Sequence, residues 1–269
     1  MHHRSMGVTV AAAWVVVAAL AAYPAGQAPA PIKEAVLGEV GEATAEISTA
    51  ELEQVLKTRS ALVLDARPFE EFAVSHIPGA LNVAAKPDVP MSMYVSDVAE
   101  IGRLVKSDKT TSLVLYCNGP NCGKSKRLAS ELRAAGFTNV RRYQLGIPVW
   151  RALGGVTVIE REGLKRVLSE DRTAVLIDVR EADAFRTGSL PNARSIPRSL
   201  VLEGKDVGEV KRAKDDGRLP MEDHNTRVIV FGGDPDAARY VAEALAHEAF
   251  HNVAYFAGTF AEASAAARP

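Results

Sequence analysis

The sequence predicts an α/β protein made of two similar domains, each with a parallel β-sheet covered by helices on both faces. Short apolar strands alternate with helical segments, which is typical of such sheets. Short motifs also recur at one offset, the 113 positions that separate Asp65-Ala66-Arg67 from Asp178-Val179-Arg180. A repeat at a fixed offset indicates a tandem duplication. The length of 269 residues, 47% of them hydrophobic, allows two domains of about a hundred residues each.

The first predicted domain covers residues 47–154 and follows an exposed lead-in over 31–46. Ser48 and Glu51 have the spacing of a capping box, which predicts the start of a helix. The elements expected after it are strands and helices in alternation: a strand over 61–64, a helix over 68–74, a strand over 81–83, a helix over 95–105, a strand over 113–116 and a helix over 124–135.

The second predicted domain, residues 155–265, repeats this order. Its expected elements are a strand over 174–177, a helix over 181–185, a strand over 227–231 and a helix over 235–246. Only Gly154-Gly155 separates the two domains, so we expect them to pack together rather than to move as two beads on a string. The charged, glycine-containing stretch 203–223 predicts a solvated surface loop.

The first 30 residues predict an export signal. Arg4 precedes an apolar run over 7–23, and small residues follow over 24–30, which is the order of a secretory signal peptide. The alternative is an uncleaved membrane anchor, because a run of roughly 17 apolar residues reaches the lower limit for a spanning helix. We therefore expect an exported protein, periplasmic or secreted, with membrane anchoring as the alternative.

The overall charge gives no electrostatic reason to expect a nucleic-acid partner. The formal net charge is −1 and the pI is about 6.6. Membrane contact is expected only if the N-terminal segment stays uncleaved. Small-molecule or protein substrates are the partners that the composition leaves open.

The two cysteines, Cys117 and Cys122, fall within one six-residue window. A disulfide framework would close longer loops, so stability is not their obvious purpose. A structural zinc site needs four ligands, and no His or further Cys lies nearby in sequence, so we predict no metal site. The pair is better interpreted as reactive, in an oxidising compartment.

Cys117 directly follows the strand predicted over 113–116, which is where doubly wound sheets carry their reactive groups. A turn-rich loop follows and then a helix. Inward backbone N–H groups, the positive end of the helix and Lys124 would all favour a thiolate, and the same cradle could bind an oxyanion. The residues predicted to surround the nucleophile and bind substrate are Asn118, Gly119, Pro120, Asn121, Cys122, Gly123, Lys124 and Ser125.

The second domain lacks a cysteine in the corresponding loop. Gly232 stands where Cys117 stands in the first copy, and the loop over 232–236 adds carboxylates where an anion would have to sit. We therefore predict a non-catalytic second copy that walls the active cleft, binds a partner or stabilises the pair.

Four motifs in order resemble the signatures of rhodanese-type sulfurtransferases. They are the segments 64–72, 76–82 and 116–119, and Gly146 followed by Trp150. The second domain is similar through segments 177–181, 188–193 and 250–253. The whole chain therefore resembles a tandem rhodanese, which implies two rhodanese-like domains, each with a parallel-stranded sheet flanked by helices.

The resemblance implies sulfurtransferase chemistry at Cys117. The cysteine would take a sulfane sulfur from a donor such as thiosulfate, become a persulfide and pass the sulfur to cyanide or a thiol, with no cofactor. In the family a basic residue near the end of the loop helps to bind the anionic donor. Lys124 is the nearest match, with Arg127 one turn later.

Two other functions remain open. Relatives of this fold with longer loops include phosphatases and arsenate reductases that use a cysteine followed by an arginine. Here no arginine precedes Arg127, and an ammonium matches a phosphoryl group less well than a guanidinium does. The third hypothesis is an exported thiol-redox or sulfur-carrier module that uses Cys117 and Cys122.

Several neighbouring residues have structural or open roles. Cys122 could act as a resolving thiol, close an inhibitory disulfide or simply fill space as a small apolar side chain. Asp65 and Arg67 are interpreted as a local ion-paired brace, and His76 as a turn residue rather than a general base. Trp150 is expected in the core or at the domain interface.

Overall fold

The computed structural model describes residues 31–86, 90 and 96–268. The predicted export signal over 1–30 lies outside them. Among the described residues, no helix combines the length and the apolar character needed to cross a membrane.

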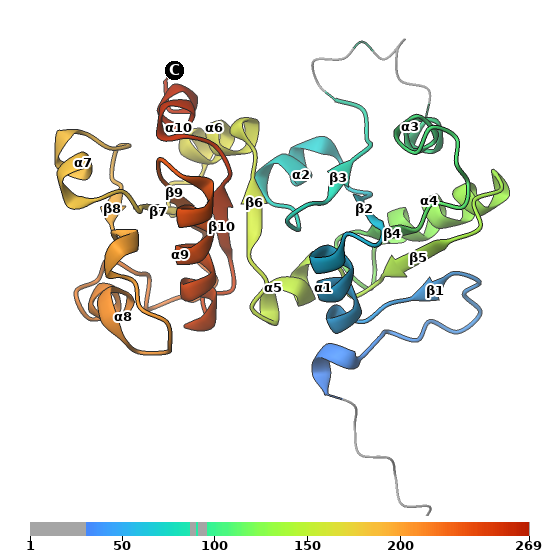
Figure 1. Ribbon diagram of the computed structural model, residues 1–269, viewed down its shortest axis with the longest axis horizontal. Helices are drawn as coiled ribbons and strands as arrows, with labels where there is room; N and C mark the ends of the chain where they lie inside the picture. Colours follow the sequence, from blue (N-terminus) through green and yellow to red (C-terminus); the bar gives the residue numbers. More distant parts are fainter. Residues whose placement is uncertain (1–30, 87–89, 91–95, 269) are drawn as a thin grey trace, which may run out of the picture. The chain divides into compact units, whose positions relative to one another are not determined.

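Two five-stranded sheets, parallel throughout, share one topology (Figure 1). The first sheet contains β1 (Ala45–Glu46), β2 (Leu62–Asp65), β3 (Leu81–Asn82), β4 (Leu113–Tyr116) and β5 (Val140–Tyr143), and the second contains β6 (Thr157–Ile159), β7 (Val175–Asp178), β8 (Arg194–Ser195), β9 (Val228–Phe231) and β10 (Val253–Phe256). Their strand orders are β1-β5-β4-β2-β3 and β6-β10-β9-β7-β8. The same order in both sheets is the structural counterpart of the sequence repeat, and the predicted α/β fold is confirmed.

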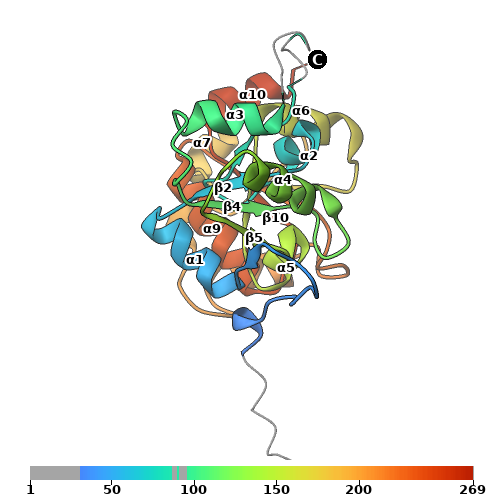
Figure 2. The ribbon, with the colours of Figure 1, turned by 90° about the vertical axis from the view of Figure 1, so that its right-hand side faces the viewer.

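The first sheet is covered on both faces (Figure 2). Its helices are α1 (Thr49–Thr58), α2 (Phe69–Val74), α3 (Asp97–Leu104), α4 (Gly123–Ala134) and α5 (Gly146–Ala152), and a short 3-10 turn, η1 (Ile32–Glu34), precedes them. Val114 and Tyr116 of β4 pack on the face that α1 and α5 cover. Leu113 and Leu115 pack against α3 and α4 on the other face. Side chains of a strand alternate between faces, so a strand buried on both sides is apolar throughout.

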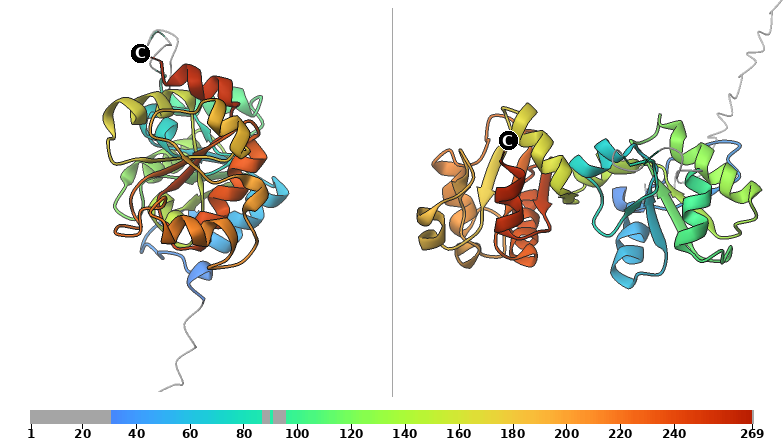
Figure 3. Two further views of the ribbon diagram at one scale, coloured as in Figure 1. Left: turned by 90° about the vertical axis from the view of Figure 1, so that its left-hand side faces the viewer. Right: turned by 90° about the horizontal axis from the view of Figure 1, so that it is seen from above.

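The second sheet is built in the same way (Figure 3). Its helices are α6 (Arg161–Glu170), α7 (Ala182–Thr187), α8 (Gly208–Asp215), α9 (Pro235–His247) and α10 (Phe260–Ala266), with a 3-10 turn, η3 (Arg198–Leu200), before α8. One core contains side chains of α8 and α9, and the core on the opposite face contains those of α6 and α10.

The expectation of a solvated loop over 203–223 is wrong. This segment contains α8, whose Val210 and Ala213 are buried in the core, and Leu219 is buried after the helix ends. Three apolar side chains spaced along a charged stretch are enough to hold an amphipathic helix on a sheet, because its charged residues occupy the outer side.

The lead-in over 31–46 contributes a strand and two ion-pairing side chains to the first domain. It ends in β1, which extends the sheet by pairing with β5. Glu39 and Glu42 both pair with the fully buried Arg142 of β5. A buried guanidinium needs such carboxylates, so this segment is part of the first domain's stability.

The two domains contact each other through α2, β6 and α6. His76 and Val158 exchange two backbone hydrogen bonds, of 3.0 and 2.8 Å, and the Glu160 N–H donates to the Ala73 carbonyl at 2.7 Å. A Cβ atom on Gly163 of α6 would fall on the Ala73 carbonyl group. Glycine at 163 therefore allows the two helices to approach this closely.

Trp150 packs at the carboxyl-terminal end of the first domain. It is buried, and its indole N–H donates to the Val156 carbonyl at 2.9 Å. Gly155 lies against the ring, where a Cβ atom would clash with the indole. The short linker is thus folded onto the first domain's core.

The contact between the two domains includes a titratable side chain, that of His76. The ring stacks on Phe72 with centroids 3.8 Å apart, its Nδ1 bonds the Phe72 carbonyl at 3.0 Å, and its Nε2 lies 3.6 Å from the Glu160 carboxylate. Burial lowers the pKa of His76 from 6.5 to about 4, although the hydrogen bond to Phe72 opposes the shift. The ring is therefore neutral at pH 7, which favours packing over acid–base chemistry.

We expect His76 to make the fold acid-sensitive. The unfolded chain takes up a proton below pH 6.5 and the folded chain only near pH 4, so the contribution is complete above pH 6.5 and is lost as the pH falls to 4. The loss should approach about 3 kcal/mol in the free energy of unfolding. Urea titrations at several pH values should show a flatter dependence for His76→Phe than for the wild type. Equal slopes would contradict this assignment.

Candidate active site

Cys117 lies at the carboxyl end of β4, between β2 and β5 in the sheet. Its carbonyl accepts a hydrogen bond of 3.1 Å from the Ile147 N–H, which ties the start of the loop to α5. The Cys117 side chain is buried, with 2% of its surface exposed. The structure thus puts the predicted nucleophile at the expected edge of the sheet but not in contact with solvent.

The sulfur of Cys117 is bonded to that of Cys122. The two Cα atoms are 6.2 Å apart, and the turn between them is held by a 3.0 Å hydrogen bond from the Cys122 N–H to the Gly119 carbonyl. Gly119 has φ +104°, which favours glycine. The structure therefore shows an oxidised loop, in which Cys117 has no free thiol.

The loop rests on neighbouring elements. Asn118 donates from its side-chain amide to the Glu71 carboxylate of α2, and Gln144 donates to the Pro120 carbonyl at 3.0 Å. Gly146, with φ +68°, faces the loop backbone, where a Cβ atom would come within 2.6 Å of the Cys117 oxygen. These contacts fix the loop's path around the sulfur.

Gly146→Ala should therefore disturb the active loop. The substitution adds the cost of a positive φ, about 1–2 kcal/mol, and forces the loop backbone away. A displacement near 1 Å should lower kcat/KM for a reaction at Cys117 by roughly 10²-fold. Gly154→Ala is the matched control, because Gly154 has φ +87° and no atom within 4 Å of a new Cβ. That control should lose stability but keep activity, and a Gly146→Ala enzyme with full activity would contradict the account.

The amino end of α4 faces this loop. The first N–H groups of a helix have no intrahelical acceptor, and Cys122, the N-cap residue of α4, offers them no side-chain capping bond. Lys124 is exposed, while Ser125 is buried and its hydroxyl has no hydrogen-bond partner among the described residues. An anion or a sulfur atom is a suitable acceptor for these donors.

The other residues predicted around the nucleophile divide by exposure. Asn118, Pro120, Asn121 and Gly123 are exposed, Cys122 is partly exposed and Gly119 is buried. The predicted residues therefore form one loop that begins at Cys117. Most of them are exposed, and Gly119 and Ser125 are buried.

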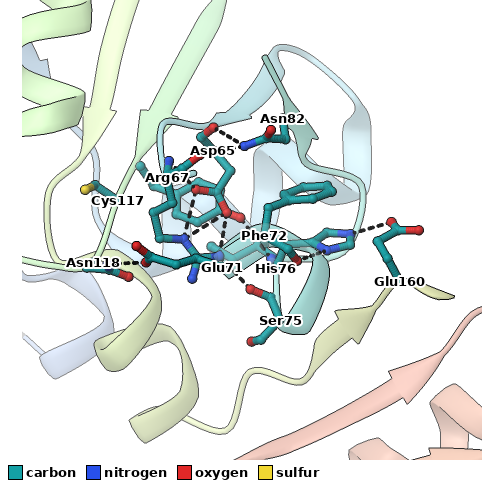
Figure 4. Close-up of polar contacts among 12 residues, drawn as sticks. Asp65, Arg67, Glu71, Phe72, Ser75, His76, Asn82, Cys117, Asn118 and Glu160 are labelled. Atoms are coloured by element: carbon teal, nitrogen blue, oxygen red, sulfur yellow. Dashed lines mark hydrogen bonds and ion pairs between the residues drawn. The ribbon is translucent and has the colours of Figure 1, made fainter. Parts of the chain in front are cut away.

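Asp65 and Arg67 form a buried brace beside the loop (Figure 4). The Arg67 guanidinium meets both Asp65 carboxylate oxygens, with the Nη2 to Oδ2 distance 2.5 Å, and also donates to the Ser75 carbonyl. Asn82 donates from its side chain to the Asp65 and Arg67 carbonyls. The brace joins the end of β2 to α2 and β3, on the side of Cys117.

A protein-family model for the rhodanese-like domain matches this chain twice, over residues 48–153 and 161–266. The chain belongs to the rhodanese-like family. The tandem arrangement predicted from the repeated motifs is confirmed.

Individual relatives match at low similarity. A helix-turn-helix-type transcriptional regulator of Mycobacterium tuberculosis is 30% identical over 108 residues, which is 40% of this chain and 42% of that protein. Among solved structures, a thiosulfate sulfurtransferase from Pseudomonas aeruginosa is 20% identical, over 80% of this chain and 43% of the other, with TM-score 0.34. A rhodanese-like domain from Anabaena is 26% identical, over 37% and 93%, with TM-score 0.28. The chain thus spans less than half the length of the regulator.

The second rhodanese-like domain differs from the first in space as well as in sequence. A Cβ atom on Gly232 would lie 2.7 Å from the Val179 side chain, whereas the position that matches Val179 in the first domain is Ala66. Asp234 caps α9 by accepting from the Asp236 N–H at 3.1 Å. Its own carboxylate therefore occupies the helix end that is left uncapped by a side chain in the first domain.

The sequence did not indicate a cavity lined in part by Glu71, the residue whose carboxylate accepts from Asn118 of the loop. It has a volume of about 490 Å³ and is lined by α2, α5 and α6, including Glu71 and Arg151. Burial, followed by repulsion from Arg227 and Arg67, lowers the pKa of Arg151 to about 10. In the described residues the only hydrogen bond of the Arg151 side chain goes to Ser75 Oγ. The cavity is formed by both copies, so no motif within one copy could indicate it.

The described residues contain no cluster of three or more His, Cys, Asp or Glu side chains able to hold a metal ion.

Proposed function

We propose that this protein is a sulfurtransferase that moves a sulfane sulfur from thiosulfate or a similar donor to a thiophilic acceptor, cyanide or a thiol. The observation that carries the proposal is the position of Cys117, in the β4–α4 loop of a rhodanese-like domain, beside a helix end that no side chain caps. That arrangement favours a thiolate and an anionic donor at one point.

The chemistry proceeds in two covalent steps on the reduced loop. The Cys117 thiolate attacks the outer sulfur of thiosulfate, the sulfur–sulfur bond of the donor breaks and sulfite leaves with its electron pair. The acceptor then attacks the outer sulfur of the persulfide, and the Cys117 thiolate is regenerated. The loop N–H groups and the Ser125 hydroxyl are available to stabilise the charged sulfur.

The second domain serves this proposal without reacting. It contributes α6 to the contact with α2, whose Glu71 holds Asn118 of the loop. We further propose that the protein works outside the cytoplasm, as the export signal predicts, on small-molecule sulfur compounds or protein thiols.

The test compares two reactions of the reduced protein. Thiocyanate should form from thiosulfate and cyanide with turnover, whereas para-nitrophenyl phosphate should not be hydrolysed. The opposite result, phosphate release without thiocyanate, would replace the proposal with a cysteine-dependent phosphatase.

We expect Lys124 to attract the anionic donor. Lys124→Ala should raise the thiosulfate KM several-fold with a smaller change in the later transfer rate, and added salt should shrink the difference by screening the wild-type charge. Lys126→Ala is the matched control, since Lys126 lies on the same helix but pairs with Glu42 at 3.0 Å. Equal KM values for Lys124→Ala and the wild type would leave the backbone N–H groups as the anion site.

A second function, a thiol-redox module, is favoured by one observation, the Cys117–Cys122 disulfide. This function predicts that the protein exchanges its disulfide with external dithiols but transfers no sulfur. Failure of both enzyme assays, with Cys117 still open to alkylation after reduction, would support it.

A further inference from the structure

The disulfide shows which atom Cys122 can reach. Its sulfur is bonded to Sγ of Cys117, the same atom that would carry the outer sulfur in a persulfide. In the loop that forms this bond, the turn is closed by the hydrogen bond from Cys122 to Gly119. Ile147 holds the start of the loop and Gln144 its middle, at Pro120. An attack by Cys122 on the inner sulfur of the persulfide would form the bond that the structure contains.

We propose that Cys122 releases the transferred sulfur as sulfide, so that the protein reduces sulfane sulfur at the expense of a dithiol; this rests on the proposed function of Cys117. The Cys122 thiolate attacks Sγ of the Cys117 persulfide, the bond between Sγ and the outer sulfur breaks, and hydrosulfide leaves with the electron pair. The product is the Cys117–Cys122 disulfide. The two cysteine sulfurs are oxidised and the sulfane sulfur is reduced to sulfide.

A dithiol then resets the loop. One thiolate of the dithiol attacks the disulfide, the second closes the dithiol into its own disulfide, and both protein thiols are recovered. Cys122 is partly exposed while Cys117 is 2% exposed, so the attack falls on Cys122 and frees Cys117 as the leaving thiolate. The net reaction converts thiosulfate and a dithiol into sulfite, hydrosulfide, a proton and a cyclic disulfide.

The position of Cys122 suits this role. It is the N-cap residue of α4, a helix of 12 residues, and its side chain makes no capping bond that would hold it elsewhere. Helix N-termini stabilise thiolates, which are the attacking species in such exchange. The loop between strand and helix is also longer in the first copy, where it covers residues 117–122, than in the second, where it covers residues 232–234. The longer loop contains the second thiol.

The experiment is one turnover of the reduced protein, with thiosulfate in excess, no acceptor, no reductant and no oxygen. Sulfite, sulfide and intact mass are measured together. The wild type should release about one sulfite and one sulfide per chain and lose about 2 Da as the disulfide forms. Cys122→Ser should release one sulfite and no sulfide, and should gain about 32 Da as a lasting persulfide.

A double variant, Cys122→Ser with Ser130→Cys, provides the matched control. It keeps two thiols, but Ser130 is exposed and lies about 12 Å farther along α4, out of reach of Cys117. Its sulfide release should stay as low as that of Cys122→Ser. When dithiothreitol is added, the wild type should release sulfide over repeated turnovers without any cyanide.

The outcomes separate the two proposals. Sulfite release with a lasting wild-type persulfide and no sulfide, or equal sulfide from wild type and Cys122→Ser, would overturn the role of Cys122 and leave the sulfurtransferase intact. Absence of sulfite and of any mass gain in all variants would overturn both.

Discussion

Cys117→Ser is expected to reduce thiocyanate formation from thiosulfate and cyanide to the uncatalysed background, a loss of more than about 10³-fold. Serine is nearly isosteric with cysteine, but a hydroxyl forms no persulfide. Because serine has nearly the shape of cysteine, it should fit the buried position at the end of β4, and the variant should keep the wild-type fold. Initial rates and circular dichroism measure the two expectations.

Cys122→Ser is the control for this substitution, since both variants lose the disulfide and only one loses the proposed nucleophile. Under reducing conditions Cys122→Ser should transfer sulfur to cyanide at a rate close to that of the wild type. Substantial turnover by Cys117→Ser, or an inactive Cys122→Ser, would mean that the nucleophile has been assigned to the wrong sulfur.

Asp65→Ala is expected to destabilise the protein by about 3–5 kcal/mol in the free energy of unfolding. It leaves the Arg67 guanidinium, whose side chain is 5% exposed, buried without its carboxylate. It also removes the acceptor that orients Arg67 toward Ser75, so the contact between the end of β2 and α2 beside the Cys117 loop should loosen. Urea titration followed by circular dichroism measures the loss.

The second domain supplies the control for this prediction. Asp178 pairs with Arg180 in the same way, but the Arg180 side chain is 15% exposed and its guanidinium stacks on Phe260 with 3.3 Å from Cζ to the ring centroid. Asp178→Ala should therefore cost less than Asp65→Ala. The reverse order would show that exposure of the arginine does not set the cost.

The sequence predicted the fold because its local signals agreed with its packing. The strand expected over 113–116 is β4 without change, and the expected capping box at Ser48 and Glu51 begins α1. Apolar runs of four residues form β4 and β9, which are buried on both faces. Segments whose role depends on distant partners were harder, as α8 shows: its few apolar residues matter only because the second sheet offers them a core.

The position of the candidate loop could be predicted from the sequence, but the oxidation state of its two cysteines could not. A cysteine after β4 and before α4 indicated the loop. The bond between Cys117 and Cys122 was one of several open possibilities, because a five-residue separation permits a disulfide without requiring one. Glu71 and Gln144 were not predicted as loop contacts, because they hydrogen-bond to the loop only in the folded structure. The lowered pKa of Arg151 comes first from burial and then from Arg227 of the other copy, neither of which a motif within one copy indicates.

The most direct test of the central claim is the mass of one peptide. Reduced Cys122→Ser protein is treated with thiosulfate without oxygen, digested, and the peptide containing Cys117 is sequenced by mass spectrometry. We expect a gain of about 32 Da on Cys117, removed by cyanide with release of thiocyanate. A peptide that stays unmodified while thiosulfate is consumed would contradict the assignment of sulfur transfer to Cys117.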